Sequence, residues 1–263
     1  MWRALALPVR AILLAVGFLF FYGGAAAFSW IGIPLLLLLR REKADRIPIS
    51  RRVVGLWARA LFGIGRRCRF LTFQPGMGLS ELPLGPCVLI ANHPTLIDVT
   101  AFLARYGHLC CVTKKRLFRD PFMGPILQQC DYIPGATGGP FAGSSVVLAG
   151  INRLNEGQCV LIFPEGTRSP IGGLQTFQRG AFEMAIRAEV PVLPFLVTCD
   201  PVILNREASL FQALWQSSRY SIVQLPKLNP QDWKGDAAAM ASHAEELFRQ
   251  HLPVAKHVEL SKP

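Results

Sequence analysis

A histidine and an aspartate five positions apart form the most suggestive pair in the sequence. They lie in residues 87–98, which read CVLIANHPTLID. A histidine held by a carboxylate can take a proton from a hydroxyl group. On a single helix His93 and Asp98 would point about 140° apart, so the two side chains can meet only if His93 precedes the helix. Pro94 favours this arrangement because proline disfavours helical backbone in the residue before it.

A structural explanation of the same pair stays open. Thr95 and Asp98 match a capping box, in which the carboxylate only stabilises the start of a helix. A single histidine–aspartate spacing of this kind is also a weak motif. Further polar groups must therefore converge on His93 before the pair indicates catalysis.

Several charged or small residues follow two other apolar runs, 109–113 and 159–163. They are Lys114, Lys115, Glu165, Gly166, Thr167, Arg168 and, shortly after, Arg179. In a parallel sheet the residues that follow each strand meet at the ligand-binding edge. There, basic side chains can hold a phosphate group, a glutamate can accept hydrogen bonds from a polyol, and Gly166 lets the backbone approach a ligand closely. The alternative is an ordinary surface ion pair and a solvated turn.

Apolar runs alternate with amphipathic segments along most of the chain. Strands are expected at 87–91, 109–113, 130–133, 159–163 and 190–197 (interrupted by Pro194), with an edge strand at 221–225. Helices are expected at 99–106, 121–129, 144–155, 180–188 and 236–251. This alternation predicts an α/β domain with a largely parallel sheet flanked by helices. The glycine-rich stretch 135–143 lacks the lysine of a P-loop and is expected to be a connection.

The N-terminal part of the chain indicates a membrane-embedded helical segment. No residue from Ala11 to Leu39 is charged. As one helix this stretch would be about 43 Å long, which exceeds the roughly 30 Å of a bilayer core. Gly23, Gly24 and Pro34 interrupt it, so it predicts either one tilted helix or two short re-entrant helices. We expect residues 1–49 to form the membrane anchor, with a globular domain over 50–263 on the cytoplasmic side, because the more basic flank follows the segment.

The globular domain is expected to begin with a helix over 50–67. Its apolar stripe contains Val53, Val54, Trp57, Leu61 and Ile64, and the arginines around it are Arg51, Arg52, Arg59, Arg66 and Arg67. This pattern predicts a helix in the membrane interface with its basic side chains near lipid phosphates. The alternative is an ordinary core helix with a solvated charged face.

Composition narrows the possible partners. The chain has a formal net charge of +11 and is 51% hydrophobic. An anionic membrane or a phosphorylated substrate fits this surface, whereas nucleic acid is not expected because the basic residues cluster beside the apolar segment and form no binding motif. The seven cysteines contain no C-x-x-C pair, so they are expected to be reduced core residues, and no metal site is expected.

Four segments, in this order, resemble the lysophospholipid acyltransferase family of the 1-acyl-sn-glycerol-3-phosphate type. They are NHPTLID at 92–98, FPEGTRS at 163–169, FQRGAF at 177–182 and VPVLP at 190–194. FPEGTRS is the most specific, and the resemblance covers roughly residues 60–200.

The resemblance implies a membrane-bound enzyme that moves a fatty acyl group from a thioester to the hydroxyl of a lysophospholipid such as 1-acyl-glycerol-3-phosphate. The donor would be acyl-CoA or acyl carrier protein, with no bound cofactor or metal. His93 would be the general base, oriented by Asp98. The acceptor and its phosphate would be held by Glu165, Gly166, Thr167, Arg168, Lys114, Lys115 and Arg179.

One departure from the family pattern concerns the acceptor. The block between the first two motifs usually ends in a basic residue that helps to hold the acceptor phosphate, but here it ends in Pro134 and Gly135. Either the other cations serve instead, or the acceptor is a lyso-aminolipid or another amphiphile without that phosphate.

Two other classes of function are also open. A lipid hydrolase would need a nucleophile, but the G-x-S-x-G elbow is absent and Ser144 and Ser145 are its nearest approach. A non-catalytic membrane module for acidic lipids would leave His93 without a role.

Overall fold

Seven strands form one sheet in the order β1-β7-β6-β2-β5-β3-β4. The computed structural model describes residues 7–73, 82, 84–136, 142–205 and 217–253. The strands are β1 (Leu71–Phe73), β2 (Val88–Ala91), β3 (Cys110–Thr113), β4 (Ile133–Pro134), β5 (Val160–Ile162), β6 (Val192–Asp200) and β7 (Ser218–Gln224). All neighbouring strands are parallel except β6 and β7. The predicted α/β class with a largely parallel sheet is therefore confirmed.

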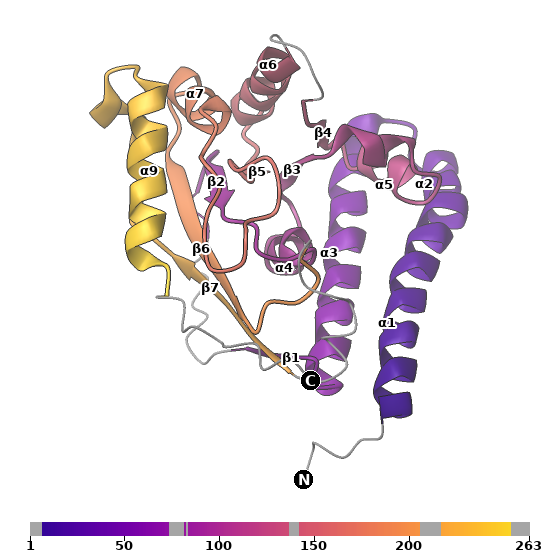
Figure 1. The fold of residues 1–263 in the computed structure, drawn as a ribbon. Coiled ribbons are helices and arrows are strands. Elements are labelled where there is room, and N and C mark those ends of the chain that lie inside the picture. Colours follow the sequence, from indigo (N-terminus) through magenta and orange to yellow (C-terminus); the bar gives the residue numbers. More distant parts are fainter. Residues whose placement is uncertain (1–6, 74–81, 83, 137–141, 206–216, 254–263) are drawn as a thin grey trace.

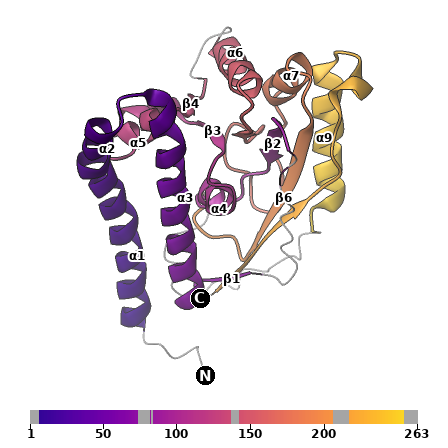
Figure 2. The same cartoon turned by 180° about the vertical axis from the view of Figure 1, so that it is seen from behind.

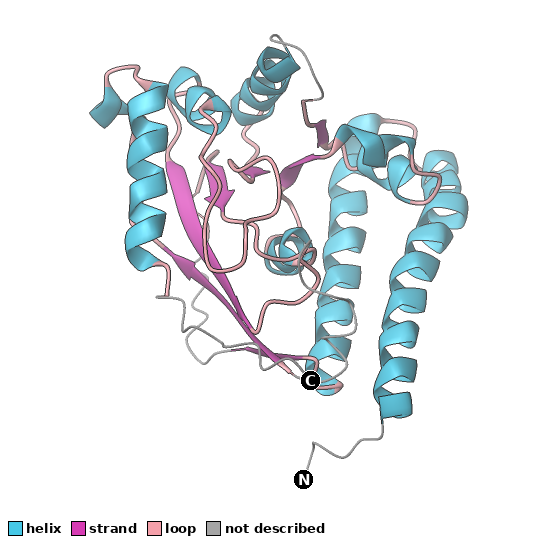
Figure 3. Ribbon diagram, viewed as in Figure 1, coloured by secondary structure: helices cyan, strands magenta, loops and turns pink. Residues whose placement is uncertain are grey.

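Helices cover both faces of this sheet (Figure 1; Figure 3). They are α1 (Leu7–Ala27), α2 (Ile33–Leu39), α3 (Lys43–Arg67), α4 (Asp98–Arg105), α5 (Met123–Gln129), α6 (Ala142–Asn155), α7 (Gly180–Arg187) and α9 (Ala237–His251). On one face α6, α7 and α9 pack against β5, β2 and β6 respectively. On the other face α4 packs on the sheet through Phe102, whose ring meets that of Phe195 edge-on at 5.4 Å, and α3 packs over α4.

The centre of the sheet is apolar on both sides. Every residue of β2 is buried, which is why its sequence is apolar at each position instead of alternating. The expectation that Pro194 interrupts the neighbouring strand is wrong, because β6 continues through it. The carbonyl of Pro194 accepts a hydrogen bond from Leu225 N–H at 2.9 Å, and the proline has no N–H to leave unpaired.

Two local expectations differ from the structure, and a third falls partly on residues that the structure does not describe. The strand expected at 130–133 is reduced to β4, because Asp131 adopts a positive φ of 56° and residues 130 and 131 form a turn. The strand near 221–225 is β7, and it is not an edge strand, since the three-residue β1 lies outside it. Part of the loop expected at 135–143 lies outside the described residues.

The apolar N-terminal segment is one continuous helix. A π-helical stretch, Phe28–Gly32, joins α1 to α2 without a reversal, so the alternative of two re-entrant helices is not what the structure shows. By length and composition the helix Pro8–Leu39 could cross a membrane. Gly24 does not break it; a side chain there would collide with Trp57 of α3, so the glycine permits close packing.

The chain reverses after α2, and α3 runs back beside α1 (Figures 1 and 2). The rings of Phe21 on α1 and Trp57 on α3 stack at 4.9 Å. Helix α3 begins at Lys43, seven residues before the expected start. The expectation that Arg51 lies near lipid phosphates is wrong, because its side chain is buried within the domain; Arg52, Arg59, Arg66 and Arg67 are exposed.

Candidate active site

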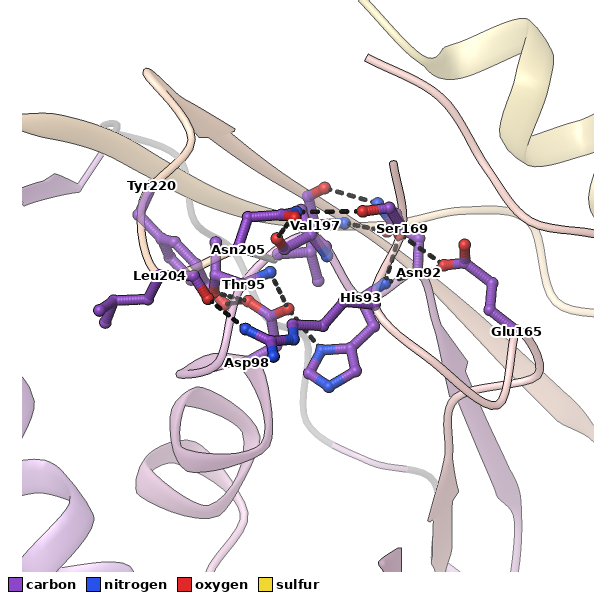
Figure 4. A network of polar contacts seen from close by, with 12 residues as sticks. Asn92, His93, Thr95, Asp98, Glu165, Ser169, Val197, Leu204, Asn205 and Tyr220 are labelled. Atoms are coloured by element: carbon purple, nitrogen blue, oxygen red, sulfur yellow. Dashed lines mark hydrogen bonds and ion pairs between the residues drawn. The ribbon is translucent and has the colours of Figure 1, made fainter. Parts of the chain in front are cut away.

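His93 lies in the loop that connects β2 to α4, beyond the carboxyl end of the strand. Its Nδ1 is 2.8 Å from Oδ2 of Asp98, the first residue of α4, so the histidine precedes the helix as predicted (Figure 4). The side chain of Asp98 is 0% exposed and that of His93 is 14% exposed. When the Nδ1–H group donates a hydrogen bond to the carboxylate, Nε2 is unprotonated. Its lone pair can then accept a proton from a substrate.

The carboxylate of Asp98 holds the turn that leads into α4 and also orients His93. Oδ2 accepts a second hydrogen bond from Thr95 N–H at 2.8 Å, which is the bond expected of a capping box. Oδ1 accepts hydrogen bonds from the hydroxyls of Thr95 at 2.5 Å and Tyr220 at 2.8 Å. Burial, reinforced by the adjacent Asp98 carboxylate, raises the pKa of the Tyr220 phenol, so the phenol stays protonated and donates.

Tyr220→Phe should lower kcat about tenfold and leave KM unchanged. A hydrogen bond to a charged group contributes about 1.5–3 kcal/mol, and without it the Asp98 carboxylate holds the imidazole less firmly. The measurement is steady-state acyl transfer, with Tyr106→Phe as a matched loss of a hydroxyl from another buried tyrosine. Equal kcat values for the two variants would contradict this role of Tyr220.

The loop that follows β5 holds the backbone of His93. The N–H of His93 donates to Glu165 Oε1 and Ser169 Oγ, each at 3.0 Å, and Ser169 N–H donates to the His93 carbonyl at 2.8 Å. The hydroxyl of Ser169 donates to Glu165 Oε1 at 2.6 Å. Phe163 completes the contact, because its ring stacks on the imidazole at 4.3 Å. The segments around residues 93 and 165, far apart in sequence, are therefore one structural unit.

The carboxylate of Glu165 is engaged by neighbouring groups of the protein. Its side chain is buried, and its second oxygen, Oε2, accepts a hydrogen bond from Gln175 N–H at 2.7 Å. Both carboxylate oxygens are thus occupied by the protein itself. The structure makes Glu165 a positioning residue for the histidine loop and gives no support to its predicted contact with the acceptor.

Glu165→Gln should change how stability depends on pH. Burial raises the pKa of Glu165 above its ordinary value of 4.5, although the hydrogen bonds from Ser169, Gln175 and His93 oppose this. The folded state therefore binds more protons than the unfolded state just above pH 4.5, so the wild type should lose stability relative to Glu165→Gln as the pH rises through that window.

Glu245 provides a control of opposite sign for this experiment. Burial alone would raise its pKa, but hydrogen bonds from Phe177 N–H and Arg249 lower it below 4.5. The wild type should therefore lose stability relative to Glu245→Gln as the pH falls below 4.5. Chemical unfolding at a series of pH values measures both differences, and slopes of the same sign would contradict the assignment.

His93 lines a cavity of about 690 Å³. Apolar residues of α1 and α3 form one part of its wall, including Leu13, Phe18, Phe21 and Trp57, and residues of α5, α6 and α7 form another. The basic residues that line it are Lys114, Arg116 and Arg168. The cavity thus combines a long apolar wall, a histidine that can accept a proton, and cations suited to a phosphate.

Two of the predicted basic residues are not in this cavity. Lys115 and Arg179 are exposed and do not contribute to its lining. Arg116 belongs to the same basic run after the strand but was not among the predicted binding residues. It lines the cavity, because the chain enters a 3-10 turn at Lys115–Arg119. Ser144 and Ser145 are exposed on α6 outside the lining, which disfavours a serine hydrolase centred on this cavity.

The remaining predicted residues lie at or beside the cavity. Arg168 lines it, and its Nη1 donates to the Leu204 carbonyl at 2.8 Å. Gly166 has a φ of 66° and lies against Gln178, so a larger residue would be strained there. Thr167 carries a buried hydroxyl without a hydrogen-bond partner among the described residues. Gly135 also lines the cavity. It lies at the end of the block in which the family resemblance leads us to expect a basic residue.

Two asparagines fix the loops around His93. Asn92 closes the end of β2 against β6, since its amide nitrogen donates to the Val197 carbonyl at 2.8 Å and its amide oxygen accepts from Val197 N–H at 2.7 Å. Asn205 donates to the carbonyls of Pro94 and Ser169 at 2.7 and 3.0 Å. The described residues contain no cluster of histidine, cysteine and acidic side chains that could hold a metal ion.

Comparison with known proteins identifies relatives of the chain. The sequence model of the Acyltransferase family matches residues 77–198. A 1-acyl-sn-glycerol-3-phosphate acyltransferase of Pseudomonas aeruginosa is 30% identical over 65% of this chain, and the alignment spans 65% of that relative's length. One of Salmonella typhimurium is 30% identical over 73% of this chain and 74% of its own length.

A solved structure has the same fold. The crystal structure of the 1-acyl-sn-glycerophosphate acyltransferase of Thermotoga maritima superimposes with a TM-score of 0.66 over 92% of this chain and 96% of that one, at 17% sequence identity. The arrangement of sheet and helices is therefore shared over most of this chain.

Proposed function

This chain belongs to the acyltransferase family of the 1-acyl-sn-glycerol-3-phosphate type, and from this we propose that it transfers a fatty acyl group from a thioester to the hydroxyl of a lysophospholipid. The observation that carries the proposal is the His93–Asp98 pair at the wall of a largely apolar cavity with Lys114, Arg116 and Arg168. A lysophospholipid and an acyl thioester have the apolar chains and phosphate groups that such a cavity would bind.

His93 acts as the general base in this proposal. Its Nε2 takes the proton from the acceptor hydroxyl while the hydroxyl oxygen attacks the thioester carbonyl carbon. The carbon–sulfur bond then breaks, and the departing thiolate takes the proton back from the imidazolium. Asp98 stabilises the charged imidazole and keeps Nε2 directed at the substrate. The N–H of His93 itself cannot stabilise the oxyanion, because Glu165 and Ser169 occupy it.

The proposed donor is acyl-CoA or acyl carrier protein, and the protein works at a membrane surface. The Pro8–Leu39 helix supports membrane attachment, and its more basic C-terminal flank supports a cytoplasmic orientation of the sheet domain. Residues of α1 line the cavity together with His93, so an acyl chain could pass between the membrane and the reacting group.

The proposed acceptor is a 1-acyl-glycerol-3-phosphate type lipid. Lys114, Arg116 and Arg168 supply cations around the cavity, even though Gly135 brings no charge. The basic residue expected near Gly135 is missing from this chain. The alternative acceptor is therefore a lyso-aminolipid or another amphiphile without that phosphate.

The test is an acyl-transfer assay with the full-length protein in membranes. A labelled acyl thioester is offered with 1-acyl-glycerol-3-phosphate, with its dephosphorylated form and with a lyso-aminolipid, and the labelled product is identified by mass spectrometry. Preference for the phosphorylated acceptor is expected. Transfer to an acceptor without phosphate would support the alternative class, and lipid binding without turnover of any thioester would contradict the enzyme assignment.

A further inference from the structure

A second cavity, of about 810 Å³, lies away from His93. Its wall comes from residues of α3 between Lys43 and Arg59, from Gly107 and His108 ahead of β3, from Asp131, and from the end of α6 with Gln158 ahead of β5. The two cavities share no lining residue. Since His108 and Gln158 precede their parallel strands, this cavity lies at the opposite edge of the sheet from the histidine loop.

A buried arginine with no acidic partner among the described residues lines this cavity. Arg51 is 4% exposed. Its Nε donates to the Cys130 carbonyl at 2.8 Å, and its Nη1 donates to the His108 carbonyl at 3.1 Å and to Gln158 Oε1 at 2.9 Å. All these acceptors are neutral, and Nη2 has no hydrogen-bond partner in the part of the chain that the structure describes. A buried charge without an opposite charge is costly, so an anion beside Arg51 would be stabilising.

The other charges around the cavity leave an excess of positive charge. Asp131 pairs with Lys43 at 2.7 Å and with Arg153 at 2.6 Å, and Glu156 pairs with Arg153 at 3.3 Å. These two carboxylates are therefore already neutralised. Arg52 and Arg59, which are exposed and two helical turns apart on α3, have no acidic partner within the described ranges.

Close packing between α3 and the end of α4 positions the groups around Arg51. A side chain on Gly55 would lie 2.8 Å from the Gly107 Cα and 3.0 Å from the Leu103 carbonyl. Two glycines thus let α3 touch the end of α4, one turn after Arg51. This contact brings the His108 carbonyl within reach of the guanidinium, whose planar face also lies 5.8 Å from the Tyr132 ring centre.

We propose that this cavity is a second anion site, which binds a phosphate group through the exposed guanidinium groups of Arg52 and Arg59, while the buried charge of Arg51 beside them adds to the positive potential. Guanidinium groups bind phosphate oxygens through paired, charge-assisted hydrogen bonds. The phosphate belongs either to an anionic phospholipid headgroup or to a soluble phosphorylated compound. The site is separate from the proposed acyl-transfer centre and does not depend on that function.

Phosphate binding to paired α3 variants tests the site. The full-length protein in a non-ionic detergent is titrated with inorganic phosphate against chloride at equal ionic strength, and binding is followed by phosphorus NMR. The double variant Arg52→Gln with Arg59→Gln should weaken phosphate binding at the second cavity about tenfold, which corresponds to about 1.4 kcal/mol. Phosphate binding at the His93 cavity should not change. Arg66→Gln with Arg67→Gln removes the same charge from exposed positions of the same helix outside the cavity and should bind as the wild type does. Arg51 is kept, because its buried side chain also supports neighbouring carbonyls.

A vesicle experiment separates the two sources of phosphate. Co-sedimentation is measured with phosphatidylcholine vesicles that contain or lack phosphatidylglycerol. A selective loss of anionic-vesicle binding in the Arg52/Arg59 variant supports a lipid headgroup, and weakened phosphate binding with unchanged vesicle binding supports a soluble ligand. The proposal is overturned if the Arg52/Arg59 variant matches the wild type in both experiments, or if the Arg66/Arg67 control loses as much binding.

Discussion

His93→Ala should lower kcat for acyl transfer by about 10³-fold, because it removes the group that accepts the hydroxyl proton. The fold should survive, since the imidazole lies at the cavity wall and its described contacts are the Asp98 carboxylate and the Phe163 ring. The measurement is kcat with a labelled thioester, together with the thermal unfolding midpoint of each preparation.

A second histidine provides the control for this experiment. His243 lies on α9 beside Trp233, outside the cavity, so His243→Ala should retain the wild-type rate. A His93→Ala enzyme that stays folded and works at nearly the wild-type rate would rule out the general-base mechanism.

Asp98→Asn should also reduce kcat by about 10³-fold, by changing the tautomer of the histidine. The Asp98 carboxylate accepts hydrogen bonds from His93, from Tyr220 and from both polar groups of Thr95. An asparagine cannot accept all of these, because its nitrogen is only a donor. When that nitrogen faces His93, Nδ1 must become the acceptor, so Nε2 carries the proton and cannot act as a base.

Asp236→Asn separates catalysis from helix capping. Asp236 caps α9 by accepting hydrogen bonds from Ala238 N–H and Ala239 N–H at 3.0 and 2.9 Å, but it lies outside the cavity. The two variants are compared by kcat and by the free energy of unfolding. Asparagine caps a helix about as well as aspartate, and both capping bonds go to one oxygen of Asp236, so Asp236→Asn should change neither value. If Asp98→Asn also keeps its kcat, then Asp98 does not set the tautomer of the base.

The elements that the sequence predicted well are those whose signal is local. Residues 87–91 and 159–163 are apolar at every position, and they correspond to β2 and β5. The edge strand β1 has only three residues, which is too short to produce a pattern, and without it β7 was expected at the edge. Helix α3 has an apolar stripe that packs on α1 and also an arginine, Arg51, whose side chain is buried in the domain. The sequence pattern did not distinguish this arginine from the exposed ones.

The proposed base and its carboxylate could be found from sequence, whereas most of their supporting partners could not. His93 and Asp98 are five residues apart, but Tyr220 reaches Asp98 from 122 residues away and Asn205 reaches Pro94 from 111 residues away. A lone tyrosine in a strand pattern resembles any core residue. Glu165 was found from its motif, but the direction in which its side chain points depends on how the loop folds. Only its contacts with Ser169 and Gln175 reveal that direction.

The long separation between Asp98 and Tyr220 sets an order of events during synthesis. Translation proceeds from the amino terminus, so the ribosome releases the apolar helix first, then His93 and Asp98, and only much later the strand that carries Tyr220. A nascent chain that ends before β7 has the proposed base but an incompletely held carboxylate. The protein therefore has its hydrophobic helix ready to meet a bilayer before the proposed catalytic pair is fully held by hydrogen bonds.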